Sequence, residues 1–319
     1  MTLTEDLRKG SRFALSRILS QVEASTPAGQ AILDELFTAT GKAHKIGITG
    51  PPGSGKSTLV NSIAHQIRLT QPESKVAVIA VDPTSPFTGG AILGDRVRML
   101  GLQNDPMVFI RSMASRGALG GLAAQTQALS QVFDAAGYNY ILIETVGAGQ
   151  SEVDIVNLAH TTIVVDLPGM GDDIQVIKAG IMEIGDIFVV NKSDRDGTDR
   201  LISEIEMMIS LNGHKKRNPS IIKTVGTENL GIDRLWKEIE RLVVILQENG
   251  EIYQRRRNRI KKEIYDLFLE NWQELFLQFI GEDRLENEVE RVLKQNSDPY
   301  FTAQELTKDF KVKFLKGGN

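Results

Sequence analysis

The spacing of apolar positions predicts helices over the first 43 residues of the chain. Apolar side chains recur there at intervals of three and four residues, which is the period of an amphipathic helix. The pattern is interrupted at 25–30 (STPAGQ), where Pro27 and Gly29 favour a break between helices. We therefore expect an N-terminal helical extension over residues 1–43.

Between residues 44 and 248 the pattern changes to short apolar runs separated by helix-like segments such as 118–136 and 198–211. Continuous apolar runs are typical of parallel strands that are buried on both faces. Their alternation with helices predicts an α/β domain with a mostly parallel central sheet flanked by helices. The predicted strands are residues 45–50, 75–82, 107–112, 140–145, 161–167, 186–191 and 220–225.

The strand pattern ends near residue 249, and 251–280 is predicted to be one long helix, with further helix to about residue 313. This helix carries an apolar stripe at helical spacing: Ile260, Ile264, Leu267, Phe268, Leu275, Phe276 and Phe279. A basic cluster overlaps its beginning: Arg255, Arg256, Arg257, Arg259, Lys261 and Lys262. The pattern favours a helical dimerisation arm over 249–319 with a solvated basic face. Binding of the basic cluster to nucleic acid or to a membrane surface is the alternative.

Composition and charge narrow the classes of partner. The 319 residues carry a formal net charge of −4, which does not favour nucleic acid or an anionic membrane, and we expect neither as a partner. The chain has no cysteine, which excludes disulfides and thiolate metal ligands. No segment has the roughly 18 apolar residues of a membrane helix, and the charged N-terminus does not resemble a signal peptide. We therefore expect a cytoplasmic protein.

Residues 50–57 read GPPGSGKS, a complete G-x-x-x-x-G-K-[ST] motif between an apolar run and a helix. Strand, loop and helix in this order are the context of a nucleotide-binding P-loop. Backbone N–H groups of the loop and the helix N-terminus bind phosphates, Lys56 reaches the β- and γ-phosphates, and Ser57 ligates Mg²⁺. The expected nucleotide contacts are Gly50, Pro51, Pro52, Gly53, Ser54, Gly55, Lys56, Ser57 and Thr58.

A second motif, NKSD at 191–194, directly follows a predicted strand. The Asp194 carboxylate can accept hydrogen bonds from N1–H and the 2-amino group of guanine, whereas adenine lacks both donors and would leave the carboxylate unpaired. Asn191 can bond the base edge or brace the loop, and the Lys192 stem can lie along the base. A helix cap at this position is the alternative. One strand later, a turn that could equally be an ordinary connection offers Val225 and Gly226.

Acidic residues at strand ends indicate a metal site. Glu144 ends the apolar run YILIE, where a carboxylate needs a cationic or hydrogen-bonding partner. Asp82 ends another apolar run, and Asp95 follows a loop rich in glycine. If these strand ends neighbour the P-loop, the three acids converge with Ser57 on Mg²⁺, which takes carboxylate and hydroxyl ligands. An Asp-Pro turn at Asp82 and a helix cap at Asp95 are open alternatives.

The segment that begins with Glu144, ETVGAGQ, predicts a nucleotide sensor. Many GTPases carry Asp-x-x-Gly here, with the glycine amide on the γ-phosphate and a glutamine next to it that orients water. Gly147 keeps this spacing, but Gln150 comes two residues late and is not assigned to the attacking water. We therefore expect slow hydrolysis. The expected catalytic group is Lys56, Asp95, Glu144 and Gly147.

Four segments together resemble the MeaB/ArgK-type GTPases: GITGPPGSGKST, AVDPTSPFTGGAILGDRVRM, ETVGAGQSEVD and DLPGMGDDIQVIKAGIMEIGDIFVVNKSD. The resemblance covers nearly the whole chain, and its middle segments are not general GTPase features. It implies a P-loop G domain between N-terminal helices and a C-terminal dimerisation arm, working as a homodimer. It also implies a chaperone that gates cofactor loading and protects an adenosylcobalamin-dependent acyl-CoA mutase of the methylmalonyl-CoA mutase type.

The same resemblance assigns residues to sites. It places Lys56, Ser57, Asp82, Asp95 and Glu144 at the nucleotide and Mg²⁺, and Asn191, Lys192 and Asp194 at the base. It further implies that a mobile loop over 168–178 relays the nucleotide state to the mutase. The residues of this loop singled out are Asp172, Gln175 and, above all, Lys178.

Two other functions remain as alternatives. A P-loop ATPase or kinase linked to arginine and ornithine transport would bind adenine, which the NKSD motif disfavours. A metal-insertion GTPase for nickel would need cysteine and histidine ligands, but the chain has no cysteine and four scattered histidines. The relative affinities for GTP and ATP separate the first alternative from a GTPase.

Overall fold

The structure is a computed structural model that describes residues 2–83, 101–102, 104–115, 121–145, 155–169, 183–211 and 218–316. Predicted features in the remaining segments lie outside the described residues. The chain forms two compact units, Met1–Arg256 and Arg257–Asn319. The division between them falls within one long helix, α11 (Glu251–Ile280).

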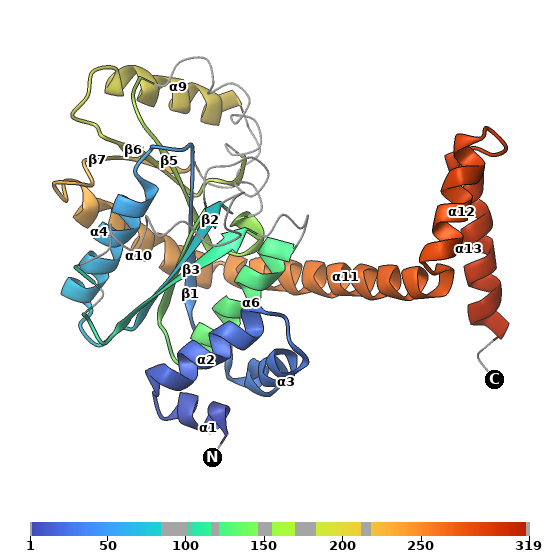
Figure 1. The fold of residues 1–319 in the computed structure, drawn as a ribbon. Helices are drawn as coiled ribbons and strands as arrows, with labels where there is room; N and C mark the ends of the chain where they lie inside the picture. Colours follow the sequence, from blue (N-terminus) through green and yellow to red (C-terminus); the bar gives the residue numbers. More distant parts are fainter. Residues whose placement is uncertain are drawn as a thin grey trace. The chain divides into compact units, whose positions relative to one another are not determined.

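The first unit is built on a seven-stranded sheet in the order β3-β2-β4-β1-β5-β6-β7, and all pairs are parallel (Figure 1). The predicted α/β architecture is confirmed, and each predicted apolar run overlaps one strand. Because β1 lies between β4 and β5, the loop after β1 lies beside the carboxyl ends of both. The strands are β1 (His44–Thr49), β2 (Val76–Pro83), β3 (Val108–Ser115), β4 (Tyr140–Glu144), β5 (Thr161–Asp166), β6 (Ile187–Asn191) and β7 (Ser220–Thr224).

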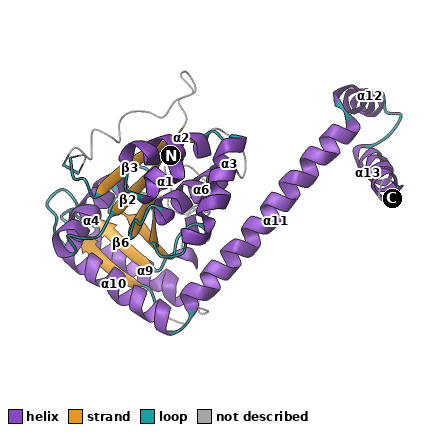
Figure 2. Ribbon diagram, turned by 90° about the horizontal axis from the view of Figure 1, so that it is seen from below, coloured by secondary structure: helices purple, strands orange, loops and turns teal. Residues whose placement is uncertain are grey.

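Helices cover both faces of this sheet, as Figure 2 shows. One face is covered by α4 and α10, and the other by α1, α2, α3 and α6, with α9 over β5 and β6. No helix among the described residues is both long and apolar enough to cross a membrane. The helices of this unit are α1 (Leu3–Arg8), α2 (Arg12–Glu23), α3 (Pro27–Leu36), η1 (Phe37–Ala39), α4 (Lys56–Thr70), α6 (Gly121–Ala135), η2 (Ile155–Asn157), α9 (Thr198–Leu211) and α10 (Ile232–Glu248), followed by the start of α11.

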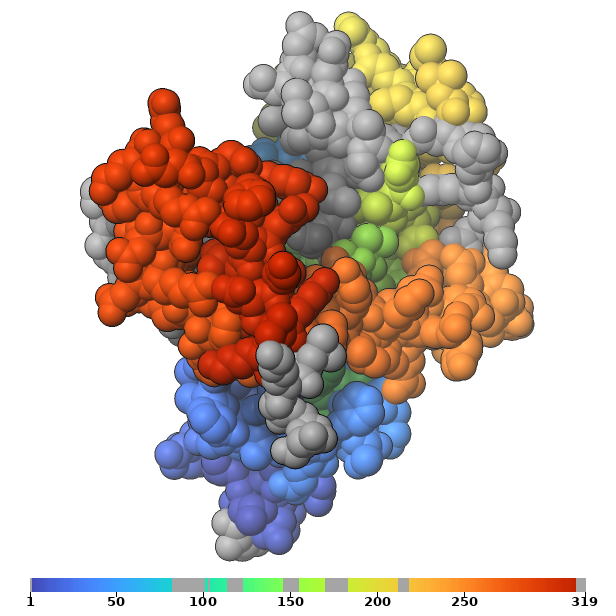
Figure 3. Space-filling view, turned by 90° about the vertical axis from the view of Figure 1, so that its right-hand side faces the viewer, coloured from blue at the N-terminus to red at the C-terminus, as the bar shows by residue number. Residues whose placement is uncertain are grey.

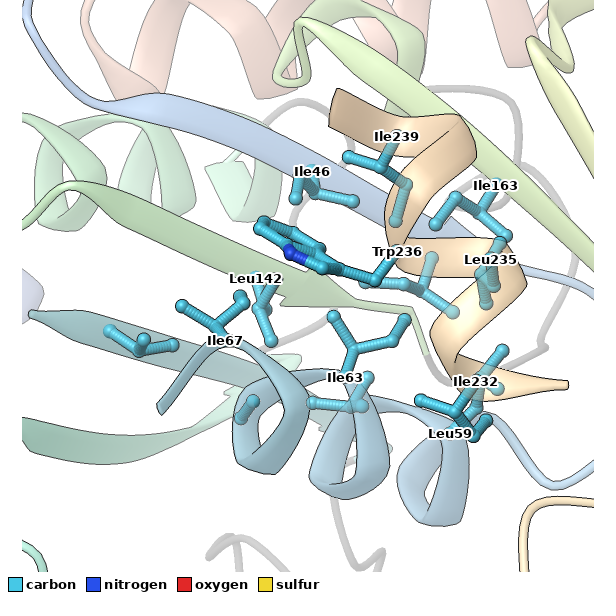
Figure 4. Close-up of a cluster of buried hydrophobic side chains, with 14 of the residues drawn as sticks. Ile46, Leu59, Ile63, Ile67, Leu142, Ile163, Ile232, Leu235, Trp236 and Ile239 are labelled. Carbon is cyan, nitrogen blue, oxygen red and sulfur yellow. The ribbon is translucent and has the colours of Figure 1, made fainter. Parts of the chain in front are cut away.

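Trp236 lies at the centre of the core between α4, α10 and the sheet (Figure 4). Its side chain is fully buried, and its ring meets that of Tyr140 edge-on with centroids 5.2 Å apart. Leu59, Ile63 and Ile67 line the inner face of α4 in the same core. Because dense apolar packing fixes α4 against the sheet, the N-terminus of α4 has a defined position at the P-loop.

The N-terminal helices begin at residues whose side chains cap them. The Ser11 hydroxyl accepts the Ala14 N–H at 3.2 Å, and the Thr26 hydroxyl accepts the Gly29 N–H at 3.0 Å. Pro27 occupies the first turn of α3, where its missing N–H costs no hydrogen bond. The Thr26 cap starts α3 at Pro27, so the break between α2 and α3 covers residues 24–26 and overlaps only the beginning of the predicted segment 25–30.

Arg12 at the start of α2 covers the edge of the sheet. Its guanidinium donates to the carbonyl oxygens of Pro106 at 2.7 Å and Val108 at 3.0 Å, and lies over the Phe109 ring. Since β3 is an edge strand, these carbonyls would otherwise be open to pairing with another strand. The N-terminal extension therefore protects this edge as well as covering a face.

Arg255 makes internal contacts in the first unit, although the basic cluster was predicted to be a solvated face. Its guanidinium donates to both carboxylate oxygens of Asp186, at 2.7 and 2.8 Å, and to the His160 carbonyl at 2.7 Å. It also donates to Glu251 at 2.7 Å within the first turn of α11. The beginning of α11 is thus bonded to the amino ends of β5 and β6, and the solvated-face interpretation is wrong for Arg255.

The second unit contains the rest of α11 with α12 (Glu282–Leu293) and α13 (Pro299–Lys316). Phe310 is buried at its centre, and the rings of Trp272, Phe276 and Phe279 lie with their centroids 5.4–5.5 Å from that of Phe310. In Figure 3 the atoms of α12 and α13, orange-red to red, form one packed body. Part of the predicted apolar stripe is therefore used inside the unit.

Candidate nucleotide-binding site

The GPPGSGKS segment forms the loop between β1 and α4, at the carboxyl end of a central strand. Gly50 has φ +139° and Gly55 has φ +91°, both in the region that favours glycine. A Cβ on Gly50 would overlap the Val165 carbonyl oxygen, and one on Gly55 would overlap the Asn191 amide. Both glycines are therefore needed for the loop to pass this close to β5 and β6.

Lys56 and the beginning of α4 provide positive charge at this loop. The Lys56 ammonium donates to the carbonyl oxygens of Gly50 at 2.7 Å and Pro51 at 3.0 Å. No side chain caps the N-terminus of α4, so its first backbone N–H groups remain suited to an anion. The remaining predicted loop contacts are Pro52 and Gly53, which are exposed, Ser54, which is buried, and Thr58, which is half-buried.

Ser57 and Glu144 meet beside the P-loop. Glu144 ends β4 next to Ile48 of β1, and its Oε1 accepts the Ser57 hydroxyl at 2.6 Å. Both side chains are buried. Serine hydroxyl and carboxylate oxygens are the hard ligands that Mg²⁺ prefers, so this donor set fits the metal. The described residues contain no cluster of three acidic, histidine or cysteine side chains for a metal, but Mg²⁺ bound with nucleotide needs only one or two protein ligands.

The other predicted residues of the metal and switch sites have no described side chain. Asp82 lies in β2, two positions beyond Ala80, which pairs with Glu144 of β4. Its backbone is therefore at the same edge of the sheet, while its side chain is outside what the structure describes. The predicted residues Asp95, Gly147, Asp172, Gln175 and Lys178 lie outside the described residues.

Asn191 joins three loops at the predicted base site. Its Nδ2 donates to the Ser54 carbonyl at 2.8 Å, and its Oδ1 accepts the Thr224 hydroxyl and the Gly226 N–H, each at 3.1 Å. Of the two roles predicted for Asn191, the structure has it bracing the loop. The neighbouring Val225 is buried, and its N–H donates to the Leu230 carbonyl.

Lys192 and Asp194 follow Asn191 in a turn. Lys192 has φ +54°, an uncommon value for a residue with a side chain, and its ammonium donates to the Gly53 carbonyl at 2.9 Å. This contact ties the NKSD turn to the P-loop. Asp194 is exposed, so its carboxylate is accessible at the same edge of the sheet. The structure thus brings the P-loop and the NKSD turn together.

Thr49, Thr145 and Thr224 were not predicted as site residues. The Thr145 hydroxyl donates to that of Thr49 at 3.1 Å, which links the ends of β4 and β1, and Thr224 bonds Asn191. Each lies at the carboxyl end of a predicted strand or directly after it. This position is the signal that could have identified them, because the carboxyl ends of parallel strands share one edge of the sheet.

Residues 15–278 match the family model described as methylmalonyl Co-A mutase-associated GTPase MeaB. A putative GTPase of Pyrococcus horikoshii is 45% identical, with 94% of this chain and 95% of that protein covered. The GTPase ArgK of Escherichia coli is 37% identical over 79% of this chain and 78% of its own. A crystal structure of LAO/AO transport system kinase is similar with TM-score 0.72 and 26% identity, covering 97% of this chain and 96% of that chain.

The match to the family model spans most of the chain and includes both nucleotide motifs, and the relatives are named GTPases over nearly the same length. These findings agree with the geometry of a P-loop braced against an NKSD turn. The chain belongs to the MeaB family of P-loop GTPases.

Proposed function

We propose that this protein is a Mg²⁺-dependent GTP switch that gates cofactor loading and protection of an adenosylcobalamin-dependent acyl-CoA mutase of the methylmalonyl-CoA mutase type. The observation that carries the nucleotide part is the Asn191 brace between the P-loop and the base loops. The family description, which names association with methylmalonyl-CoA mutase, supports the partner.

In this proposal the chain's own residues bind and orient the triphosphate. Lys56 exchanges the carbonyls that it now contacts for phosphate oxygens, and Ser57 and Glu144 hold the metal, with Asp82 and Asp95 as further ligands. When bound, Mg²⁺ supplies positive charge that stabilises the negative charge of the transferred phosphoryl group. Gly147 contacts the γ-phosphate, and the late position of Gln150 makes hydrolysis slow, as suits a switch.

Asp194→Asn tests the assignment of guanine. It replaces an acceptor of two guanine donors by an amide that can donate instead. Hydrogen bonds to a charged group contribute about 1.5–3 kcal/mol each, so GTP affinity should fall about 100-fold. Xanthosine triphosphate, which has an oxygen in place of the 2-amino group, should bind more tightly to the variant than GTP does.

The measurement is titration of wild type, Asp194→Asn and Asp196→Asn with GTP, ATP and xanthosine triphosphate. Asp196 is an exposed acid in the same turn, so its substitution controls for loss of charge. Equal affinity of the wild type for GTP and ATP, or unchanged GTP affinity in Asp194→Asn, would exclude guanine recognition. It would instead favour an ATP-dependent transport kinase.

The mutase partner requires a separate experiment. We expect the protein to form a complex with an adenosylcobalamin-dependent mutase of the same organism, and the affinity should differ between GDP and a non-hydrolysable GTP analogue. Sedimentation of the mixed proteins measures whether the complex forms and how its affinity depends on the nucleotide. Lys178→Ala should reduce this nucleotide dependence, whereas Lys237→Ala, an exposed lysine of α10, should not. Absence of a complex in every nucleotide state would contradict the proposed partner.

We extend the proposal to a homodimer formed through the C-terminal arm. Large apolar side chains at the surface of the second unit support it. Exposed apolar side chains are unfavourable in water, and their burial between two copies of the chain would stabilise a dimer. Those at least half exposed among the described residues are Ile264, Tyr265, Leu267, Phe268, Leu293, Tyr300 and Phe301.

A further inference from the structure

Ser62 makes an unusual hydrogen bond for a serine inside a helix. It lies in α4, belongs to neither nucleotide motif and is buried. Its hydroxyl donates to the Gly226 carbonyl at 3.1 Å, across 164 residues of sequence. Helical serine and threonine hydroxyls commonly donate to a carbonyl of their own helix, as Thr70 of α4 does to Gln66 at 2.9 Å. The Ser62 hydroxyl therefore connects α4 to the loop after β7.

The acceptor of this bond is a residue of the predicted base pocket. Gly226 donates its N–H to Asn191 Oδ1 at 3.1 Å and accepts the Ser62 hydroxyl with its carbonyl oxygen. Asn191 in turn donates to the Ser54 carbonyl in the P-loop at 2.8 Å. Because the P-loop leads directly into α4, the bonds close a ring through the P-loop, β6, the β7 loop and α4.

The loop after β7 passes close to α4 at Gly226. A Cβ on Gly226 would lie 3.4 Å from the Thr58 methyl and 3.5 Å from Asn191 Oδ1, so the loop backbone passes directly over α4. With no side chain, Gly226 can be held only through its backbone groups and this close approach. Loss of the Ser62 hydroxyl would release the carbonyl and leave the N–H contact alone.

We infer that Ser62 is a positioning residue for the guanine base, which holds Gly226 and, through it, Asn191 in the geometry that accepts guanine. This inference rests on the proposed binding of guanine nucleotides. Ser62 does not touch the phosphates in this assignment, and the P-loop keeps its Asn191 bond at Ser54, so the effect falls mainly on the nucleoside half of the ligand.

Ser62→Ala tests the inference with GDP and inorganic pyrophosphate as probes, the latter reporting on the P-loop alone. Loss of one neutral hydrogen bond should weaken GDP binding about fivefold, mainly through faster dissociation, while pyrophosphate affinity stays unchanged. Ser62→Cys keeps the shape of the side chain with a slightly larger atom but is a weak donor, so it should resemble Ser62→Ala. The matched control is Ser203→Ala, whose hydroxyl donates only to Asp199 of its own helix.

Four outcomes decide the matter. Wild-type GDP affinity in Ser62→Ala, or an equal loss of pyrophosphate affinity, overturns the role of Ser62 in positioning the base. Recovery of GDP affinity in Ser62→Cys also overturns it, because packing would then explain the effect. If the wild type binds GDP no more tightly than ADP, the proposed guanine function fails, and the inference fails with it.

Discussion

Replacement of Glu144 with glutamine is expected to reduce Mg²⁺-dependent GTP hydrolysis about 100-fold, the usual scale for losing one electrostatic group of an active site. Glutamine has the same shape and can still accept the Ser57 hydroxyl, which Glu144 accepts at 2.6 Å. The change therefore removes the negative charge next to Ser57 and leaves the local packing. Hydrolysis and nucleotide binding that depend on Mg²⁺ should weaken, whereas nucleotide binding without metal should not.

Three measurements distinguish this role from a structural one. Steady-state GTP hydrolysis gives the rate, and Mg²⁺ titration of the GDP complex should show weaker apparent metal affinity. GDP affinity in the presence of a chelator should change less than about threefold, because a phosphate contact is not lost. Glu240→Gln makes the same chemical change on α10, where the carboxylate bonds Gln71, and should leave all three quantities unchanged. A rate in Glu144→Gln within threefold of the wild type would refute a role for Glu144 at the metal.

The central strands β1, β4, β5 and β6 could be predicted because they are buried on both faces. In β4, Ile141 and Ile143 point into one core and Leu142 into the other, so apolar residues follow one another along the strand and do not alternate with polar ones. Strand order leaves no such signal in the sequence. The neighbours of β1 depend on which crossovers pack best on the completed sheet.

Local motifs predicted the candidate site. The hydrogen bonds between its segments could be identified only from the folded structure. Ligand chemistry sets the spacing of the glycines in the P-loop and the position of the acid in NKSD. Both motifs could therefore be identified from consecutive residues. The Asn191 contacts with Ser54 and Gly226 join segments more than 30 residues apart and depend on β5 and β6 following β1 in the sheet. Ser62 had no local signal, because a serine in a helix pattern is ordinary.

Within the basic cluster at the start of α11, Arg255 was misassigned for the same reason. In sequence, Arg255 is one of several consecutive cations, and a helical face of cations is usually solvated. Its partner Asp186 lies 69 residues earlier, at the amino end of β6. Burial opposes its charge, but hydrogen bonds and the charges of Asp186 and Glu251 raise the pKa of Arg255 above its ordinary value. Arg255 stays charged without Asp186 as well, because an arginine guanidinium is not deprotonated in proteins.

Asp186→Asn is consequently expected to lower the free energy of unfolding of the first unit by about 3 kcal/mol, the lower end for removing one partner of a buried ion pair. Asparagine preserves the volume and can still accept the Thr162 N–H, which Asp186 Oδ2 accepts at 2.9 Å. It leaves the Arg255 guanidinium, three-quarters buried, without its bidentate carboxylate. Much of the loss is the cost of desolvating that cation.

The chain offers a way to observe the first unit alone. It has two tryptophans, Trp236 in the core of the first unit and Trp272 in the second, so urea unfolding in a Trp272→Phe background reports on Trp236. Asp199→Asn is the matched control, because Asp199 pairs with Lys223 at the same 2.7 Å but in solvent, where an ion pair contributes little.

Combining Asp186→Asn with Arg255→Met should recover most of the lost stability, since an apolar side chain needs no carboxylate partner. Recovery of stability in the double variant would show that Asp186→Asn destabilises the unit by leaving the buried Arg255 cation unpaired and not by altering the packing at Asp186. A single-variant effect no larger than that of Asp199→Asn would show that the pair contributes no more than a surface contact. In that case the attachment of α11 to β5 and β6 would depend on other contacts, such as apolar packing and the Arg255 bond to the His160 carbonyl.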